Sequence, residues 1–372
     1  MIKCLLPLTV LFSATLAVPA SAVSFASNGI YEVHIESRTS GDENQFGSWN
    51  AITDAGHPTG AGNNLLYRDT TTFTNFSSLR IFDPTEFRDY TFGGAGSGSA
   101  FDLDPFLSFE GDSSFVPAGQ GFQTIWDLTT ENLNIAQDVF VTGSAFDDSA
   151  IYHTVELSNT GLDAISLRWR NLYDWTVNDP DFDDGPSNQV ETLAGVVLPE
   201  NTFEFSYAPT GNEFVRVASN PAPLGGPTYE PLLALGFDPE LVPGLSVTRP
   251  DEYAFVSWPN AEDTDFDYTV DETLDVASPG LPDDSAGLSW FGRDAASAIA
   301  LNPEESIRLT QVIFGVAAGD PPPTPDPDPS PDPDPSPDPD PEKVPEASMV
   351  LGLLLLGGEL VRRRANLAKL QN

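Results

Sequence analysis

The sequence predicts an all-β fold, either one large antiparallel β-sandwich or two smaller sandwiches packed together. Short runs in which apolar and polar residues alternate recur along residues 23–319, and a period of two is typical of half-buried strands. Turns with glycine, proline or asparagine separate the runs, and no long stretch keeps the 3.6-residue period of a helix. Most of the 24 Phe, 9 Tyr and 6 Trp belong to this body, which is enough for a real core.

The clearest alternation covers residues 151–175. Ile151, His153, Val155 and Leu157 share one face of the first run, and Leu167, Trp169, Asn171, Tyr173 and Trp175 share one face of the second. Because an Asn/Gly-containing turn separates the runs, the pattern predicts an antiparallel hairpin. The other predicted strands are Ile30–Ile35, Gln123–Leu128, Asp138–Val141, Phe203–Tyr207, Phe214–Ala218, Tyr253–Val256 and Ile307–Val316.

The composition divides the chain into four segments. Residues 1–22 combine Lys3, an apolar run and the small-residue site Ala20-Ser21-Ala22, the layout of a cleaved secretory signal peptide. The only cysteine, Cys4, lies there, so the exported chain has no disulfide and no cysteine metal site. The remaining segments are the β body at 23–319, with a candidate subdivision near 190–200, a Pro/Asp-rich linker at 320–343 and a hydrophobic C-terminal segment at 344–372.

The body is strongly acidic. Of 16 basic and 56 acidic residues, the first 22 hold one base, and the tail from Pro345 holds four bases and two acids, which leaves a net charge of −43 for residues 23–344. Nucleic-acid binding requires Lys and Arg against phosphates and is excluded by this balance. Divalent cations, calcium above all, are plausible partners. The alternative is that the acidity only maintains solubility.

The linker at 320–343 is a spacer. Its unit PDPDPS repeats nearly three times, and 12 of its residues are proline. Proline holds the chain near polyproline II, and neighbouring carboxylates repel one another. At about 3.1 Å per residue the linker would span roughly 70 Å.

The C-terminal segment resembles a PEP-CTERM sorting signal. Val344-Pro345-Glu346-Ala347-Ser348 precedes an apolar stretch, and the cluster Arg362-Arg363-Arg364 follows it. In this family a V-P-E-P motif, one hydrophobic helix and terminal arginines stand in the same order, and Ala347 occupies the place of the second proline. The resemblance implies signal peptidase cleavage, transient retention in the inner membrane, processing by an exosortase-like enzyme, and delivery to the cell surface or extracellular matrix.

The apolar segment fits such temporary membrane residence. Residues 344–361 would span about 27 Å as a helix, marginal against a hydrocarbon core of about 30 Å. The three arginines behind it would stay cytoplasmic. Glu359 interrupts the apolar run but lies near the arginine end, where it could pair with Arg362 or Arg363. A plain membrane anchor or a buried core helix is the alternative.

The most suggestive chemical motif is the stretch "NDPDFDDGPSNQVE". A calcium loop needs several oxygens around the ion and a glycine for the sharp turn. Because the spacing departs from an EF-hand and the flanks resemble strands, the calcium hypothesis competes with that of a solvated turn. The candidate ligands are Asp179, Asp181, Asp183, Asp184 and Glu191. A second stretch repeats the rhythm with Asp263, Asp265, Asp267 and Asp271.

Two further groups of residues invite a functional interpretation. Trp169, Tyr173 and Trp175 could form a sugar-stacking platform, although large aromatics at alternating strand positions favour a packed core. The histidines His34, His57 and His153 lie far apart in sequence, and His57, in a glycine-rich loop, is expected to be the most exposed. No catalytic motif is present, so the sequence names no catalytic residue and no certain cofactor.

The function expected from these features is that of an exported, acidic, structural or adhesive protein of the cell surface or matrix, without catalysis. The alternative is a secreted carbohydrate-binding or carbohydrate-active protein that meets an extracellular polysaccharide, with calcium as a candidate cofactor. The enzyme alternative requires two carboxylates about 5–10 Å apart in a cleft lined by aromatic residues.

Overall fold

The computed structural model describes the body of the chain with internal gaps. The described residues are 23–36, 47–67, 74–82, 86–92, 103–109, 120–177, 187–201, 203–218, 229–261, 264, 266–274, 285–294 and 296–317. Within them the fold is almost entirely antiparallel β, which confirms the predicted class. All nine predicted strand segments overlap observed strands.

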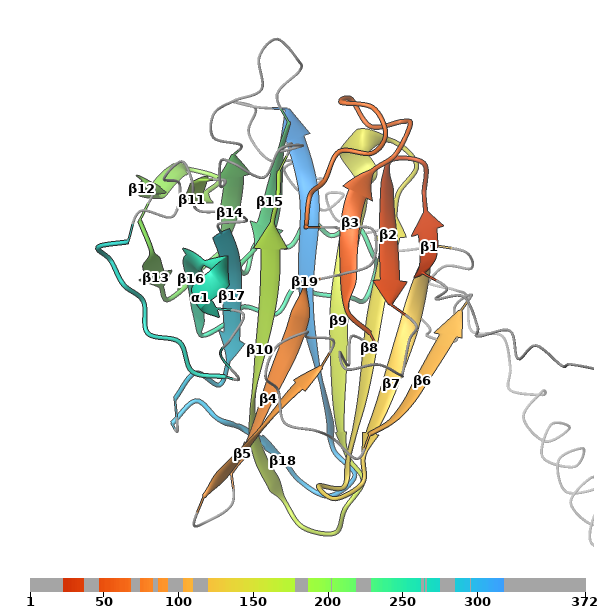
Figure 1. Ribbon diagram of the computed structural model, residues 1–372, viewed down its shortest axis with the longest axis vertical. Coiled ribbons are helices and arrows are strands. Elements are labelled where there is room, and N and C mark those ends of the chain that lie inside the picture. Colours follow the sequence, from red (N-terminus) through yellow and green to blue (C-terminus); the bar gives the residue numbers. More distant parts are fainter. Residues whose placement is uncertain are drawn as a thin grey trace, which may run out of the picture. The chain divides into compact units, whose positions relative to one another are not determined.

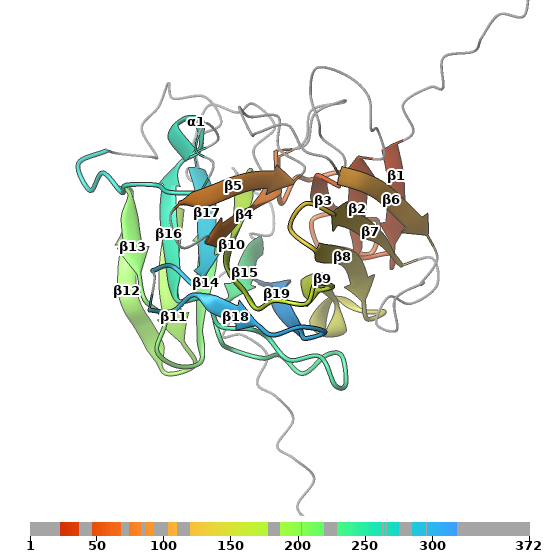
Figure 2. The same cartoon turned by 90° about the horizontal axis from the view of Figure 1, so that it is seen from below.

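The larger of two facing sheets has nine strands (Figures 1 and 2). In spatial order they are β12 (Gly195–Asn201), β11 (Ser187–Thr192), β14 (Glu213–Ala218), β15 (Tyr229–Ala234), β19 (Ser306–Ala317), β9 (Ala150–Asn159), β8 (Leu133–Thr142), β7 (Gly121–Leu128) and β6 (Leu103–Phe109). Strands β9 and β19 lie in the middle of this order and pair along nearly their whole length. Strands from both sides of residues 190–200 therefore share one sheet.

The second large sheet has seven strands. Its path is β13 (Phe205–Tyr207), β16 (Glu252–Ser257), β17 (Ser285–Phe291), β10 (Ile165–Trp175), β4 (Phe76–Phe82) and β5 (Phe87–Phe92), and β18 (Ile299–Leu301) pairs with β10 off this path. A third, smaller sheet of β1 (Val23–Ser27), β2 (Tyr31–Glu36) and β3 (Trp49–Thr53) lies against β7, β8 and β9. The described helices are short: the 3-10 turn η1 (Phe146–Asp148) and α1 (Trp258–Ala261).

The hairpin predicted for residues 151–175 is wrong. Both strands exist, but β9 pairs with β8 and β19, whereas β10 pairs with β4, β17 and β18 in the other sheet. The connecting residues 160–164 therefore cross from one layer to the other. The predicted inner faces still meet, because the His153 ring and the Tyr173 hydroxyl are 2.9 Å apart across the interior.

Strand β10 is buried on both faces, unlike the strand of a simple two-layer sandwich. Leu167 and Trp169 belong to the core between the sheets. On the opposite face, the guanidinium of Arg170 donates to the backbone carbonyls of Thr264 and Phe266, so these two residues cover this part of the sheet. No helix in the described part of the chain is long and apolar enough to cross a membrane.

Candidate functional site

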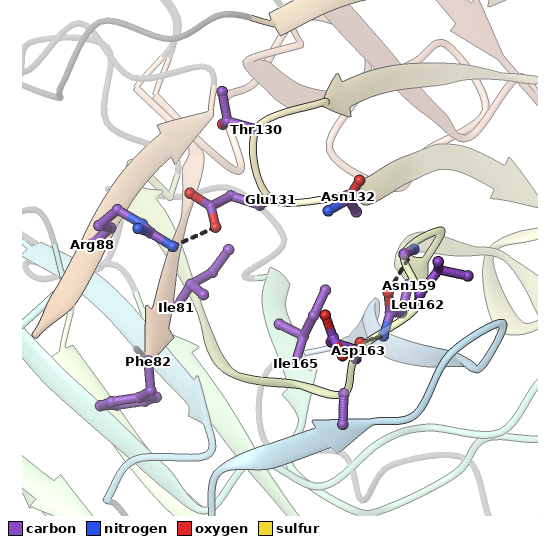
Figure 3. A pocket seen from close by; sticks show the side chains of 12 residues that line it. Ile81, Phe82, Arg88, Thr130, Glu131, Asn132, Asn159, Leu162, Asp163 and Ile165 are labelled. Atoms are coloured by element: carbon purple, nitrogen blue, oxygen red, sulfur yellow. Dashed lines mark hydrogen bonds and ion pairs between the residues drawn. The ribbon is translucent and has the colours of Figure 1, made fainter. Parts of the chain in front are cut away.

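A pocket of about 520 Å³ opens where strands β4 and β5 meet two connections of the sandwich (Figure 3). Strands β4 and β5 supply one wall, the β7–β8 turn supplies the second, and the crossing between β9 and β10 supplies the third. The lining residues are Ile81, Phe82, Arg88, Thr130, Glu131, Asn132, Asn159, Gly161, Leu162, Asp163, Ala164 and Ile165.

Backbone hydrogen bonds hold the two turns of the pocket together. Asn132 adopts a left-handed conformation with φ of 53°, which asparagine tolerates and which closes the β7–β8 turn. Its carbonyl accepts from the Thr160 amide at 2.8 Å. In the crossing, the Asn159 side chain donates to the Asp163 carbonyl at 2.8 Å and accepts from the Gly161 amide at 2.9 Å. The rim of the pocket is thus preformed in the protein without a ligand.

Glu131 is the most enclosed charged group of the pocket, with a side chain only 8% exposed. Arg88 donates to its Oε2 at 2.6 Å and the Tyr90 hydroxyl donates to its Oε1 at 2.5 Å. Burial, together with the neighbouring Glu131 carboxylate, raises the pKa of Tyr90 to about 12. The phenol therefore keeps its proton as a donor at neutral pH, and Glu131 is held in one orientation.

The rest of the pocket combines exposed polar groups with apolar surface. The side chains of Asn132 and Asp163 lie at exposed positions, and Ile81 and Ile165 contribute aliphatic surface. Leu162 is 93% exposed although it is a large aliphatic residue. Such a mixture of a few directed polar groups and apolar surface suits a small polar ligand with a C–H face.

The three aromatic residues considered as a sugar platform lie in the core. Trp169, Tyr173 and Trp175 are each at most 1% exposed. The Trp169 indole donates to the Asn171 side chain at 2.6 Å, and the Tyr173 hydroxyl donates to Gln311 at 2.8 Å. The structure thus supports the packed-core interpretation, and these rings present no face to a sugar in solution.

Most of the first candidate calcium loop, Asp179, Asp181, Asp183 and Asp184, lies outside the described residues. Its last member, Glu191, accepts from the Arg216 side chain at 3.0 and 3.2 Å, so both carboxylate oxygens already have a partner. In the second stretch, Asp263 and Asp265 lie outside the described residues. Asp267 binds Arg80 at 2.7 Å, and Asp271 accepts from Thr273. Among the described residues, no group of three or more metal-ligating side chains is found.

The sorting motif Val344, Pro345, Glu346, Ala347 and Ser348 and the cluster Arg362, Arg363 and Arg364 also lie outside the described residues. The predicted sorting signal therefore stays a prediction.

The expectation that His57 is exposed is wrong. Its side chain is inserted among the rings of Tyr31, Phe146 and Tyr229, with centroid distances of 5.6, 5.0 and 4.3 Å, and the residue is only 3% exposed. Its Nδ1 lies 2.7 Å from the Thr59 hydroxyl and 3.2 Å from the Thr59 amide, whereas its Nε2 is buried without a hydrogen-bond partner among the described residues. Burial lowers the pKa of His57 to about 4.

The other two histidines lie on strands, as expected, and both are buried. His34 contacts Glu32 at 2.5 Å. His153 lies between Gln137, at 3.1 Å from Nε2, and Tyr173, at 2.9 Å from Nδ1. Burial lowers the pKa of His153 to about 3, so the ring is neutral in the folded protein at physiological pH.

The pocket residues were not identified from the sequence. Apart from Leu162, the pocket residues of the two connections are polar or small, and turn composition indicates only that the chain reverses there. The exposed Leu162 within "SNTGLDA" was the available signal, because a large aliphatic residue at a turn tip serves no core.

Comparison with known proteins gives no family. No family model matches the chain, and no curated protein matches it. Among solved structures, the chain is similar to a galactose mutarotase related enzyme from Lactobacillus acidophilus, with 7% identity, a TM-score of 0.43, and coverage of 82% of this chain and 100% of the other. A galactose mutarotase-like protein from Lactobacillus casei has 10% identity, a TM-score of 0.36, and coverage of 79% and 100%.

A polysaccharide lyase is also similar, with 11% identity and a TM-score of 0.39. The match covers 80% of this chain but only 33% of the lyase, so the chain spans about one third of that protein's length. Likenesses this distant assign no activity and no residue role.

Proposed function

We propose that the protein is an exported saccharide-binding protein and that the pocket between strands β4 and β5 and the β7–β8 and β9–β10 connections takes the sugar. The observation that carries the proposal is the composition of this pocket. A fixed carboxylate, exposed amide and carboxylate groups and an exposed leucine lie around about 520 Å³. Hydroxyl groups of a sugar pair with the polar side chains, and the C–H face of its ring packs on the aliphatic surface.

The contacts of Glu131 favour binding over hydrolysis. Glycoside hydrolysis requires one carboxyl group that gives up a proton and a second that attacks or activates water. Both oxygens of Glu131 already accept hydrogen bonds from Arg88 and Tyr90, which suits a group that orients a ligand. The proposed activity is therefore recognition without catalysis.

Leu162 allows a clean test because its side chain makes almost no contact with the folded protein. We expect Leu162→Ala to weaken saccharide binding several-fold and to leave the free energy of unfolding within about 0.5 kcal/mol of the wild type. Leu193→Ala is the matched control, because Leu193 is also an exposed leucine, 47% accessible, and lies in the β11–β12 turn away from the pocket.

The measurement is a glycan array with the full-length chain, followed by titration calorimetry with the best ligand. The proposal is rejected if no saccharide binds, or if Leu162→Ala and Leu193→Ala bind as tightly as the wild type. A structural or adhesive protein without a sugar site would give the first outcome, and a sugar site elsewhere on the protein would give the second.

For localisation, we propose export through the signal peptide and sorting by an exosortase-type system. The support is the order of motif, apolar segment and arginine cluster at residues 344–364. Ala347→Pro restores the family motif and is expected to speed processing in an exosortase-containing host, measured by pulse-chase and immunoblot. Unchanged processing together with stable membrane retention would instead indicate a plain anchor.

A further inference from the structure

Arg168 is a buried guanidinium to which the described part of the chain offers no carboxylate within ion-pair distance. The residue is 8% exposed, and its guanidinium carbon lies 4.1 Å above the Phe82 ring. Its recorded hydrogen bond runs from Nη1 to the Arg293 carbonyl at 3.1 Å. Its Nε is buried without a partner. Burying a cation without a counter-charge is costly, so this arrangement calls for an anion.

The other arginines of the described residues have a different environment. Arg80, Arg88, Arg216, Arg293 and Arg308 each have a carboxylate within 4.0 Å. Arg170 is fully buried, but it donates to two carbonyls and two hydroxyls. Arg249 is exposed and therefore needs no compensation.

The acids around Arg168 are committed to other partners. Asp267 binds Arg80 at 2.7 Å, and Asp294 accepts from the backbone amides of Ala296 and Ser297 at 2.8 and 2.9 Å. Glu252 accepts from Arg293 at 3.0 Å. Burial, and then the neighbouring positive charge of Arg80, lowers the pKa of Arg168. An incoming anion would thus meet a local positive charge within an otherwise acidic body.

Arg168 faces away from the core. Its neighbours in β10, Leu167 and Trp169, point between the two sheets, so the side chain of Arg168 lies on the outer face of the seven-stranded sheet. On the same face Phe87 is paired in register with Phe82 and is 55% exposed. Phe82 also lines the pocket, so the arginine and the pocket are joined through one aromatic ring.

We propose that Arg168 anchors an oxyanion site on the outer face of the seven-stranded sheet, which binds the carboxylate or sulfate group of an acidic saccharide. The planar fork of a guanidinium matches the paired oxygens of both groups. Phe87 supplies apolar surface for the sugar ring beside the acid group. The saccharide part of this inference rests on the proposed function, whereas the oxyanion site stands on the environment of Arg168.

Titration calorimetry of the full-length chain tests the site with three probes: trigalacturonate, a neutral trisaccharide and inorganic sulfate. The buffer should contain about 0.15 M salt, because the screening length is then about 8 Å and repulsion by the acidic body is short-ranged. We expect Arg168→Gln to weaken trigalacturonate binding about tenfold or more, as loss of a charge-assisted pair does. Arg249→Gln, an exposed arginine exchanged in the same way, should bind as the wild type does.

Thermal unfolding of the unliganded protein provides a second readout. If Arg168 lacks its anion, Arg168→Met should unfold at the same temperature as the wild type or higher, because an uncompensated buried charge is replaced by an apolar chain of similar length. Sulfate stabilises folded proteins in general, but it should raise the unfolding temperature of the wild type more than that of Arg168→Met. A lower unfolding temperature of Arg168→Met, with an unchanged response to sulfate, would overturn the proposal.

The outcomes separate this site from the pocket. Equal trigalacturonate affinity of the wild type and Arg168→Gln overturns the oxyanion site, and the proposed function stands if Leu162→Ala still weakens the neutral trisaccharide. A third outcome is that sulfate binds in a way that depends on Arg168 while no saccharide binds. This outcome would overturn the proposal that the anion belongs to an acidic saccharide.

Discussion

Acidification from pH 6.5 to pH 4.5 is expected to lower the free energy of unfolding steeply, because two buried histidines stay neutral in the folded protein. The pKa of His57 is lowered to about 4 and that of His153 to about 3, from an ordinary value of 6.5. Between the folded and unfolded pKa values the unfolded chain binds more protons than the folded protein. The stability that depends on the neutral histidines is therefore fully present above pH 6.5 and is lost as the pH falls. Each histidine contributes at most about 1.4 kcal/mol per pH unit, which gives about 4 kcal/mol for the two over this range.

The geometry explains why neither ring accepts a second proton easily. In the imidazolium form both nitrogens of His57 carry a proton, and the N–H at Nε2 would be buried without an acceptor among the described residues. His153 contacts the neutral side chains of Gln137 and Tyr173, which supply no counter-charge. The ring of His57 is enclosed by aromatic side chains, and none of the described residues offers it a carboxylate within ion-pair distance.

Urea denaturation at several pH values between 7 and 4.5 measures the effect. His57→Phe keeps a ring in the aromatic cage, and His153→Gln keeps a side chain that can pair with Gln137 and Tyr173. Each variant should remove about half of the pH dependence, and the double variant most of it. The depressed pKa values of Asp54 and Asp148 place their own losses below pH 4, outside this window. A double variant with the slope of the wild type would show that other groups cause the acid sensitivity.

Glu204→Ala is expected to destabilise the protein by about 3–5 kcal/mol, since it removes a buried group that three donors share. Glu204 is fully buried. Its Oε1 accepts from the Ser257 amide at 2.9 Å and the Tyr268 hydroxyl at 2.5 Å, and its Oε2 accepts from the Asp271 amide at 2.8 Å. Without the carboxylate, the Ser257 amide and the Tyr268 hydroxyl, which belong to buried residues, would lose this acceptor.

Two comparisons give this prediction its specificity. Glu204→Gln keeps one acceptor and is expected to lie between the wild type and Glu204→Ala, because its amide group would face a donor. Glu156→Ala breaks an exposed ion pair with Arg308 and should cost less than about 1 kcal/mol. Chemical denaturation gives the free energies, and limited proteolysis shows whether residues 264–274 detach first. A loss below about 1 kcal/mol for Glu204→Ala would contradict the structural role of the carboxylate.

The sequence predicted the strands whose apolar and polar side chains alternate clearly. The alternation in residues 151–158 and 307–316 predicted β9 and β19, and both lie at the centre of a sheet. The same alternation could not reveal that β9 and β10 belong to different layers. Alternation with a period of two indicates which residues of a strand share a face. It does not indicate which other strand becomes the hydrogen-bonding neighbour.

The candidate site was harder to predict because it is assembled from distant turns. Residues near 81, 131 and 162 are far apart in sequence and are brought together only by the tertiary fold. His57 shows the same limitation, since its glycine-rich loop predicted a turn, whereas the position of its ring depends on Tyr229 and Phe146, which are far away in sequence. Arg168 belongs to a strand that was predicted, but its lack of a counter-charge depends on where neighbouring acids point.

The crossing at residues 160–164 has a consequence for how the chain folds. It joins β9 and β10, so His153 and Tyr173 meet across the interior although only 20 positions separate them. By contrast, Ser77 and Asn171, on adjacent strands of one sheet, are 94 positions apart. The entropy lost on closing a loop grows with the length of the loop. The contact of His153 with Tyr173 between the two sheets therefore costs less entropy than the contact of Ser77 with Asn171 within the seven-stranded sheet. Residues 150–175 can therefore act as a local nucleus that aligns the two sheets before their remaining strands are added.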